Sequence, residues 1–206
     1  MSGGKLADGL ASLERATALD PRSLVVANNH GEILLTLGRY ADAKTRCEPV
    51  LEFAPNYVGC LDNISRAELL LGDFDAARQT LERLAAADNP SAGGQGRELA
   101  EALAGRSDRH ALALRYSALP ANSDLDPTSG NVFPGYEIPV VLMLLGEREL
   151  TISCLERLAG RLGSHADWAV MMPAMDPIRC DPRFVAIIQR LKTTDPYAAK
   201  ICAGKQ

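Results

Sequence analysis

The residues that most often carry catalysis or bind metal ions are few in this sequence and are spaced poorly for either task. The three histidines, His30, His110 and His165, form neither an H-E-x-x-H motif nor a pair four residues apart on one helix face. Cys154 and His165 are types that could act as nucleophile and base, but a helix rises ~1.5 Å per residue and would hold them apart. The sequence therefore predicts no catalytic centre and no metal site among these residues.

The cysteines stand at positions 47, 60, 154, 180 and 202, an odd number without any C-x-x-C spacing. This spacing disfavours both a disulfide framework and a tetrahedral zinc site made of thiolates. We expect buried or half-buried thiols in a reducing compartment.

Nucleotide-binding and hydrolase motifs are also missing from the sequence. The segment Gly93-Gly94-Gln95-Gly96 has a composition that suits phosphate, but no predicted strand precedes it and no lysine follows at the required place. We interpret it as a flexible loop between helices. Carboxylate pairs such as Asp73 and Asp75 fall at a helix start, where they favour the helix dipole. We expect no enzymatic activity and no cofactor.

The composition favours a helical protein without a nucleic-acid or membrane surface. Of the 206 residues, 47% are hydrophobic and only 5% are aromatic, with alanine and leucine dominant. The formal net charge of -4 lacks the basic excess of nucleic-acid or anionic-membrane binding. The apolar run Ile138–Leu145 is interrupted by Pro139 and is shorter than the ~20 residues of a membrane span. Because Met1–Leu10 has no apolar core of a signal peptide, we expect a cytoplasmic location.

An internal repeat organises the elements that carry these residues. The segment Leu35–Lys44 resembles Leu69–Arg78 at an offset of 34 residues, and the same offset relates Pro21 to Pro55 and Gly4 to Gly38. A glycine at a helix end adopts the left-handed conformation cheaply, and a proline ends the following helix. The period therefore predicts pairs of antiparallel helices.

The pattern resembles the tetratricopeptide repeat, strongly over residues 4–88 and more weakly to residue 162. In one period the family's small, large, small and proline positions are occupied by Gly31, Leu34, Ala43 and Pro55. The next period has Ser65, Ala77, Leu81 and Pro90 at comparable places. Two departures are Ala27, where the family has tryptophan, and Cys47, where it has a large residue. The resemblance implies an all-α fold, a right-handed superhelix of antiparallel helix pairs.

The repeat pattern predicts one array over residues 1–192 and a loosely ordered tail over residues 193–206. Its repeats cover about residues 4–22, 23–56, 57–90, 91–122 and 132–164, with a capping segment over 165–192. Pro120–Pro134 and Asp88–Gly96 are expected to be loops because they are rich in turn residues.

The two ends of the array raise separate hypotheses. Lys5–Leu19 corresponds to the second helix of a repeat without its first, which suggests a fragment of a longer protein. A naturally short array, or a neighbour's helix docked there, is the alternative. Met175–Phe184 has the pattern Asp-Pro-x-Arg-x-Asp-Pro-Arg-Phe, which resembles the closing segment of repeat regions in bacterial signalling proteins that carry winged-helix, nucleotide-cyclase or kinase domains. We expect this segment, in which Asp181 and Pro182 suit a helix start, to cap the last apolar face.

By the same resemblance, the first helices line a concave groove that binds extended peptides or helices of partner proteins. The candidate groove residues are Asn28, Glu32, Leu35, Asp62, Arg66, Leu69, Phe133, Tyr136 and Val140. Asn29 and Asn63 lie one period apart, but the lysines of the family's carboxylate clamp are missing. Glu32 and Asp62 would repel an acidic tail, so we expect a basic or mixed partner segment.

Three hypotheses about function follow. The first is a protein-binding or sensory repeat domain of a bacterial regulator, with no direct contact to nucleic acid or membrane. The second is a self-associating module that forms a homodimer through the helix Lys5–Leu19, with Leu6, Leu10 and Leu13 at the contact. The third is a small-molecule sensor that uses the space beneath the Pro120–Pro134 loop.

Overall fold

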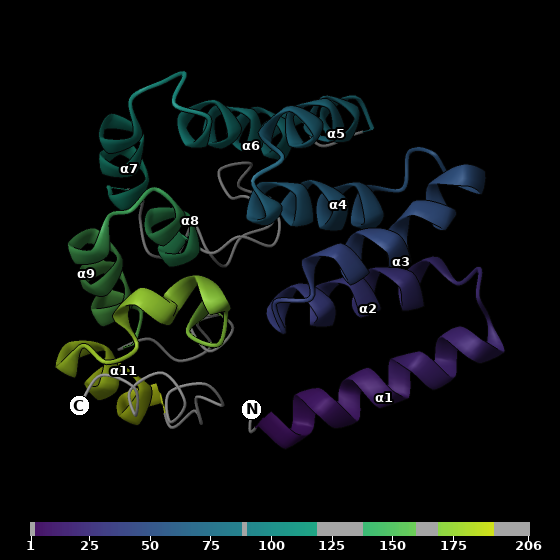
Figure 1. Cartoon of the computed structure of the whole chain (residues 1–206), viewed down its shortest axis with the longest axis horizontal. Coiled ribbons are helices and arrows are strands. Elements are labelled where there is room, and N and C mark those ends of the chain that lie inside the picture. The colour runs from purple at the N-terminus through teal and green to yellow at the C-terminus, as the bar shows by residue number, and fades with distance from the viewer. Residues whose placement is uncertain (1–2, 88–89, 119–137, 160–168, 192–206) are drawn as a thin grey trace. The chain divides into compact units, whose positions relative to one another are not determined.

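The computed structural model describes residues 3–87, 90–118, 138–159 and 169–191. Within these residues, the regular elements are ten α-helices and one 3-10 helix, and consecutive helices pack as antiparallel pairs (Figure 1). The predicted all-α fold of helix pairs is confirmed. The described helices fall into two compact units, with α1 to α6 in the amino-terminal unit and α7 to α11 in the carboxy-terminal unit.

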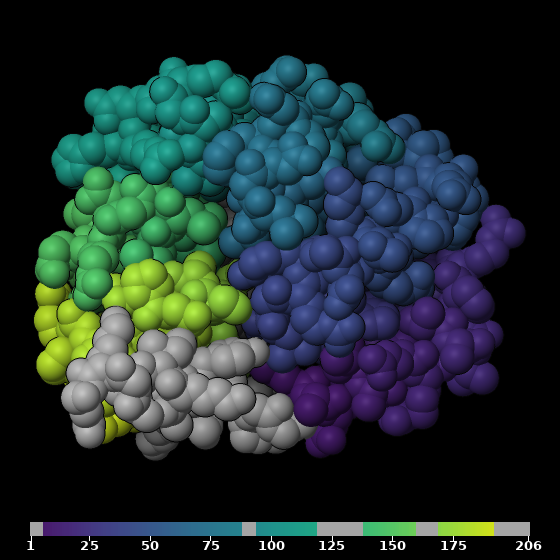
Figure 2. All heavy atoms as spheres, in the orientation of Figure 1, coloured from purple at the N-terminus to yellow at the C-terminus, as the bar shows by residue number. Residues whose placement is uncertain are grey.

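The amino-terminal unit contains two complete helix pairs flanked by further helices. Its elements are α1 (Gly3–Leu19), α2 (Leu24–Thr36), α3 (Tyr40–Phe53), α4 (Val58–Leu71), α5 (Phe74–Ala86) and α6 (Pro90–Leu103). Helix α2 pairs with α3 and α4 with α5, and α2 also packs against α4. In the space-filling view the successive helices of this unit adjoin one another (Figure 2).

The carboxy-terminal unit is smaller and is described by itself. Its elements are α7 (Arg109–Ser117), α8 (Ile138–Leu144), α9 (Arg148–Leu158), the 3-10 helix η1 (Pro173–Ile178) and α11 (Pro182–Leu191). Helices α8 and α9 form its central pair, η1 packs on α8, and α11 packs on α9. The expectation of one array over residues 1–192 stays a prediction.

Left-handed glycines make the turns that the repeat pattern predicted. Gly38 and Gly72 have φ angles of 74° and 81°, and Gly105 and Gly146 repeat the same conformation. After Gly72 the Asp73 amide donates to the Glu68 carbonyl at 2.9 Å, which closes the end of α4. The Asp73 carboxylate then accepts from the Ala76 amide at 3.2 Å and begins α5.

Small residues let the helices of the amino-terminal unit approach closely. One core cluster contains Ala27, Cys47, Val50, Cys60 and Ile64. A second cluster contains Leu34, Leu35, Ala43 and Ala67. Both clusters join α2, α3 and α4, so this part of the core holds adjacent repeats together.

Helix α1 packs on α2 through the face that the dimer hypothesis used. Leu6 is buried and Leu10 packs against the second core cluster. Farther along α1, Thr17 and His30 lie within hydrogen-bond distance at 3.3 Å. Leu6 and Leu10 are therefore covered within the chain, and charged substitutions there would test folding rather than a dimer contact.

The predicted glycine loop before α6 is wrong. Helix α6 begins at Pro90, so Gly93–Gly96 is helical. Proline suits the first helical position because its missing amide hydrogen has no partner there. A Cβ on Gly96 would lie 2.4 Å from Leu81 Cδ2, so glycine at this place permits the close contact of α5 and α6.

Contacts in the carboxy-terminal unit explain several residues of the motif Met175–Phe184. Asp181 accepts from the Arg183 amide at 2.9 Å where α11 begins, and Phe184 is fully buried. Arg183 bridges to α9, with contacts of 2.9 Å to Glu149 and 2.8 Å to Glu156. The segment therefore packs on α9, and its role as the cap of a repeat array stays a prediction.

The cysteine expectation holds in part. Cys47, Cys60 and Cys154 are buried thiols. Cys180 is disulfide-bonded, so the expectation of thiols throughout is wrong. Sequence spacing fails here because pairing depends on which sulfur atoms the fold brings together, not on their separation along the chain. Cys202, His165, Phe133, Tyr136, the Pro120–Pro134 loop and the tail 193–206 lie outside the described residues.

No helix in the described part of the chain is both long enough and apolar enough to cross a membrane.

Candidate partner-binding site

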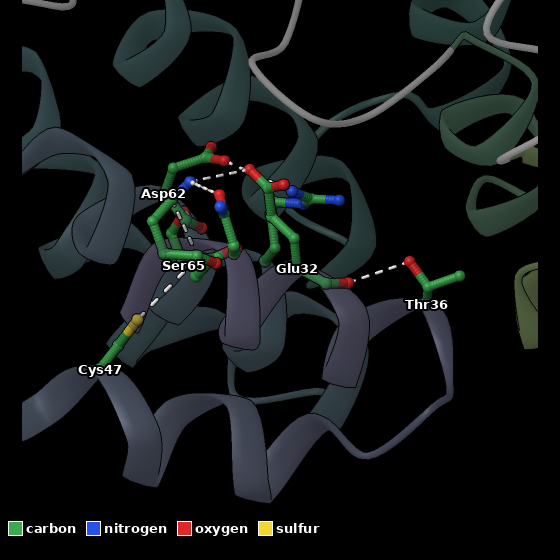
Figure 3. A network of polar contacts seen from close by, with 9 residues as sticks. Glu32, Thr36, Cys47, Asp62 and Ser65 are labelled. Atoms are coloured by element: carbon green, nitrogen blue, oxygen red, sulfur yellow. Dashed lines mark hydrogen bonds and ion pairs between the residues drawn. The ribbon is translucent and has the colours of Figure 1, made fainter. Parts of the chain in front are cut away.

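Helices α2 and α4 place four of the predicted groove residues in one polar network. Asn28 and Glu32 lie four residues apart on α2, and Asp62 and Arg66 lie four apart on α4. Residues at this spacing share a helix face. We call these four residues, together with Asn63, the α2–α4 polar network, which Figure 3 shows from close by.

On α2, the network is held by side-chain hydrogen bonds along the helix. Asn28 Nδ2 donates to Glu32 Oε1 at 3.1 Å, and a longer contact of 3.4 Å reaches Asn29 Oδ1. The Thr36 hydroxyl donates to the Glu32 carbonyl at 2.9 Å (Figure 3). The Glu32 side chain is exposed and thus available to a partner.

On α4, a largely buried ion pair joins Asp62 to Arg66. Arg66 Nη1 lies 3.5 Å from Asp62 Oδ2, and the two side chains are only 8% and 14% exposed, respectively. Burial raises the pKa of Asp62 to about 7; the nearby charge of Glu32 also raises it, while Arg66 opposes the shift. The Asp62 carboxyl is therefore held close to its point of ionisation at neutral pH.

Asn63 connects the two helices and is a residue that the groove prediction left out. Its Nδ2 donates to the Asn28 carbonyl at 3.0 Å and to Asn28 Oδ1 at 3.2 Å. Glycines permit this approach, because a Cβ on Gly31 would lie 2.7 Å from Asn63 Nδ2 and one on Gly59 would lie 2.4 Å from Asn28 Oδ1. Asn63 is one period from Asn29 in the sequence, but its hydrogen bonds go to Asn28.

The other predicted groove residues are not part of this network. Leu35 is fully buried in the second core cluster, and Leu69 is buried as well. Both belong to helices packed on two sides, since α2 and α4 each contact α3 and one another. Val140 is buried in α8 of the carboxy-terminal unit.

A second polar cluster was missed by sequence reasoning. Glu68 is buried, accepts from Lys44 at 2.8 Å and from the Thr80 hydroxyl at 2.8 Å, and so links α3, α4 and α5. The hydrogen bond to Glu68 raises the pKa of Lys44. The only signal in the sequence was a charged residue within the run of α4 that ends Leu69-Leu70-Leu71. Glu68 and Thr80 are buried, so we assign this cluster to packing between the helices.

The chemistry of the α2–α4 polar network is that of ionic recognition. It brings the carboxyl groups of Glu32 and Asp62 together with the single guanidinium of Arg66. In the described residues, no group of three or more His, Cys, Asp or Glu side chains could hold a metal ion.

Antiparallel helix pairs with left-handed glycines between their members are the architecture of helical repeat proteins. Residues 34–95, from the end of α2 into α6, match the family model of the tetratricopeptide repeat. Domains built from this repeat are generally protein-interaction modules and are typically non-catalytic. Searches of the curated proteins and of the solved structures found no significant match to the chain.

Proposed function

We propose that the chain is a protein-interaction module and that its α2–α4 polar network binds a positively charged segment of a partner protein. The observation that carries this proposal is the proximity of two carboxyl groups from neighbouring helices, Glu32 and Asp62. Burial, and in addition the charge of Glu32, raises the pKa of Asp62 and thus the cost of ionising it.

A cationic side chain would relieve this repulsion. A lysine or arginine between Glu32 and Asp62 would stabilise both ionised carboxylates and donate charge-assisted hydrogen bonds to them, each contributing about 1.5–3 kcal/mol. An acidic segment would instead meet two like charges. The guanidinium of Arg66 attracts carboxylates, but the neighbouring carboxylate of Asp62 already compensates the positive charge of Arg66.

We further propose that the module acts within a bacterial regulatory protein. The support is the motif Asp176–Phe184, which resembles the closing segments of bacterial signalling proteins and leads into α11, the helix that packs on α9. Co-purification of the full-length product from its native host would test this; recovery without any regulatory partner or domain would count against it.

The binding proposal is tested with peptides of graded charge. The wild-type chain and the double variant Glu32→Gln, Asp62→Asn are measured by fluorescence anisotropy against otherwise identical lysine-rich, neutral and glutamate-rich peptides. We expect the lysine-rich peptide to bind best and the double variant to weaken it at least tenfold. The matched control is Glu52→Gln, an exposed charge on α3 away from the network. Equal binding by the double variant and the control would refute the proposal.

A further inference from the structure

Each carboxyl group of the α2–α4 polar network has one oxygen atom that receives no hydrogen bond. Glu32 Oε1 accepts from Asn28 Nδ2 at 3.1 Å, and Asp62 Oδ2 lies 3.5 Å from Arg66 Nη1. Among the described residues, no donor reaches the second oxygen of either group, Glu32 Oε2 or Asp62 Oδ1. The side chains of Glu32 and Asp62 point toward one another (Figure 3). Acceptors from two helices therefore converge on one place.

The network also contains a buried acceptor without a donor. Asn63 has no exposed surface, and its Nδ2 donates to the backbone and side-chain oxygens of Asn28. Within the described part of the chain, Asn63 Oδ1 has no hydrogen-bond partner. A buried acceptor in this state destabilises a protein until a donor reaches it. The network is thus short of donors, and a ligand that brings several of them would complete it.

We propose that this site selects lysine over arginine in the partner segment, and that Asn28 is the residue that sets the preference. The ligand is the primary ammonium group of one lysine side chain of the partner protein. This inference rests on the proposed function, which it deepens by naming the cation that the α2–α4 polar network accepts.

Arginine is disfavoured by the state of each carboxyl group. A guanidinium binds a carboxylate most strongly as a planar fork that uses both oxygens of the same group. Asn28 holds one oxygen of Glu32, and Arg66 lies against one oxygen of Asp62. Neither carboxyl group therefore offers both oxygens to a second guanidinium. The donors of a guanidinium also lie in one plane, which limits how well they reach acceptors on two different helices.

Lysine suits the same site because its donors are not confined to one plane. An ammonium has three donors, and rotation about its terminal bond directs them to separate oxygens. One donor can reach Glu32 Oε2 and a second can reach Asp62 Oδ1. The third can hold a water that bridges to Asn63 Oδ1, since that oxygen is buried and lies out of direct reach. A single lysine thus supplies the donors that the network lacks.

Asn28 sets the preference through the orientation of its amide. Asn63 Nδ2 donates to Asn28 Oδ1 at 3.2 Å, which turns Asn28 Nδ2 toward Glu32. Asn28 therefore keeps Glu32 Oε1 occupied before any partner binds. In Asn28→Ala this oxygen is released, and Glu32 becomes able to accept an arginine fork with both of its oxygens.

The test compares two peptides of equal charge on the intact chain. One is the lysine-rich peptide of the binding experiment, and the other has arginine at each lysine position. Both are acetylated at the amino terminus, so that only side chains carry positive charge. Binding is measured by fluorescence anisotropy at pH 8, above the pKa of Asp62 of about 7. The wild-type chain should bind the lysine peptide about tenfold more tightly, as expected for one additional charge-assisted hydrogen bond.

Asn28→Ala is the variant that separates specificity from shape. It should bring the affinities of the two peptides to roughly the same value by strengthening arginine binding, whereas a loosened site would weaken both peptides alike. Asn28→Ser is the second variant in case alanine destabilises α2. Glu52→Gln, the exposed control on α3, should keep the wild-type preference for lysine.

The outcomes distinguish this inference from the proposed function. Arginine binding equal to or tighter than lysine binding in the wild-type chain would overturn the inference and leave the proposed function standing. Binding of both cationic peptides no tighter than that of the neutral peptide would overturn the proposed function and the inference together. A preference for lysine that persists unchanged in both Asn28 variants would refute the role of Asn28.

Discussion

Arg179 is expected to contribute more to stability than any other charged residue of the capping segment. Its side chain is fully buried. Nη1 donates to the Val170 carbonyl at 3.0 Å, and Nη2 donates to the carbonyls of Met171 at 3.3 Å and Met172 at 2.8 Å. Nε reaches Asp176 at 2.7 Å. The Arg179 guanidinium thus donates hydrogen bonds to three consecutive backbone carbonyl groups ahead of η1.

The loss of stability in Arg179→Met follows from the hydrogen-bond acceptors that lose the guanidinium as a donor. The Met172 carbonyl keeps the Met175 amide as a donor at 3.0 Å. The carbonyls of Val170 and Met171 lose the guanidinium, and a buried acceptor without its donor costs about 1–3 kcal/mol. Asp176 is 46% exposed and regains water at little cost. We therefore expect a loss of about 3 kcal/mol in the free energy of opening this segment.

Hydrogen exchange measured by mass spectrometry over residues 169–191 reports this loss directly. A change of about 3 kcal/mol predicts roughly hundredfold faster exchange in the Arg179→Met chain. Arg183→Met is the matched control, because it removes the same group from the same segment but from an exposed ion pair with Glu149 and Glu156. Exchange that is equally fast in the two variants, or unchanged in both, would refute the assignment of Arg179 as the centre of the cap.

Three further predictions concern the pH dependence and the helix contacts. Because the pKa of Asp62 rises from 3.8 to about 7 on folding, the folded chain binds a proton that the unfolded chain has lost. Stability should therefore fall by up to about 1 kcal/mol per pH unit from pH 4 to pH 7; urea titrations should show this slope reduced in Asp62→Asn, and an unchanged slope would contradict it. Gly31→Ala should cost about 1–3 kcal/mol because its Cβ would meet the side chain bridging α2 and α4. Gly94→Ala has open space in α6 and should stabilise by about 1 kcal/mol; thermal unfolding with the same sign for both would refute the packing argument. Proton NMR titration should place the pKa of His110 above 6.5, raised by its hydrogen bond to a glutamate, and that of His30 below 6.5, lowered by burial; the reverse order would be contrary to the structure.

The sequence contained enough information for the turns and helix pairs because these depend on local rules. Gly38 and Gly72 have left-handed φ angles because at each of them a helix ends and the chain reverses within two residues. The same reasoning failed at Gly93–Gly96, where glycine composition indicated a loop. Tertiary packing decides that case, because Leu81 occupies the space that a Cβ on Gly96 would need.

The candidate site could be predicted only in part because a helical period identifies a face and not its neighbours. Asn28, Glu32, Asp62 and Arg66 follow from a spacing of four residues, and the structure brings them together. Leu35 follows from the same register but packs into the second core cluster, since α3 and α4 both cover α2.

The polar network and the core beneath it cannot be altered independently, which determines how the binding proposal must be tested. Asn63 touches Asn28 on one side and the Cys47 sulfur on the other. A substitution at Asn63 would therefore change the recognition surface, the helix contact and the environment of the Cys47 thiol together. Glu32 and Asp62 reach the same surface from positions where amide replacements keep the shape of the side chain. Loss of peptide binding in those replacements, in chains that keep their helical fold, is thus attributable to charge, whereas loss in an Asn63 variant is not.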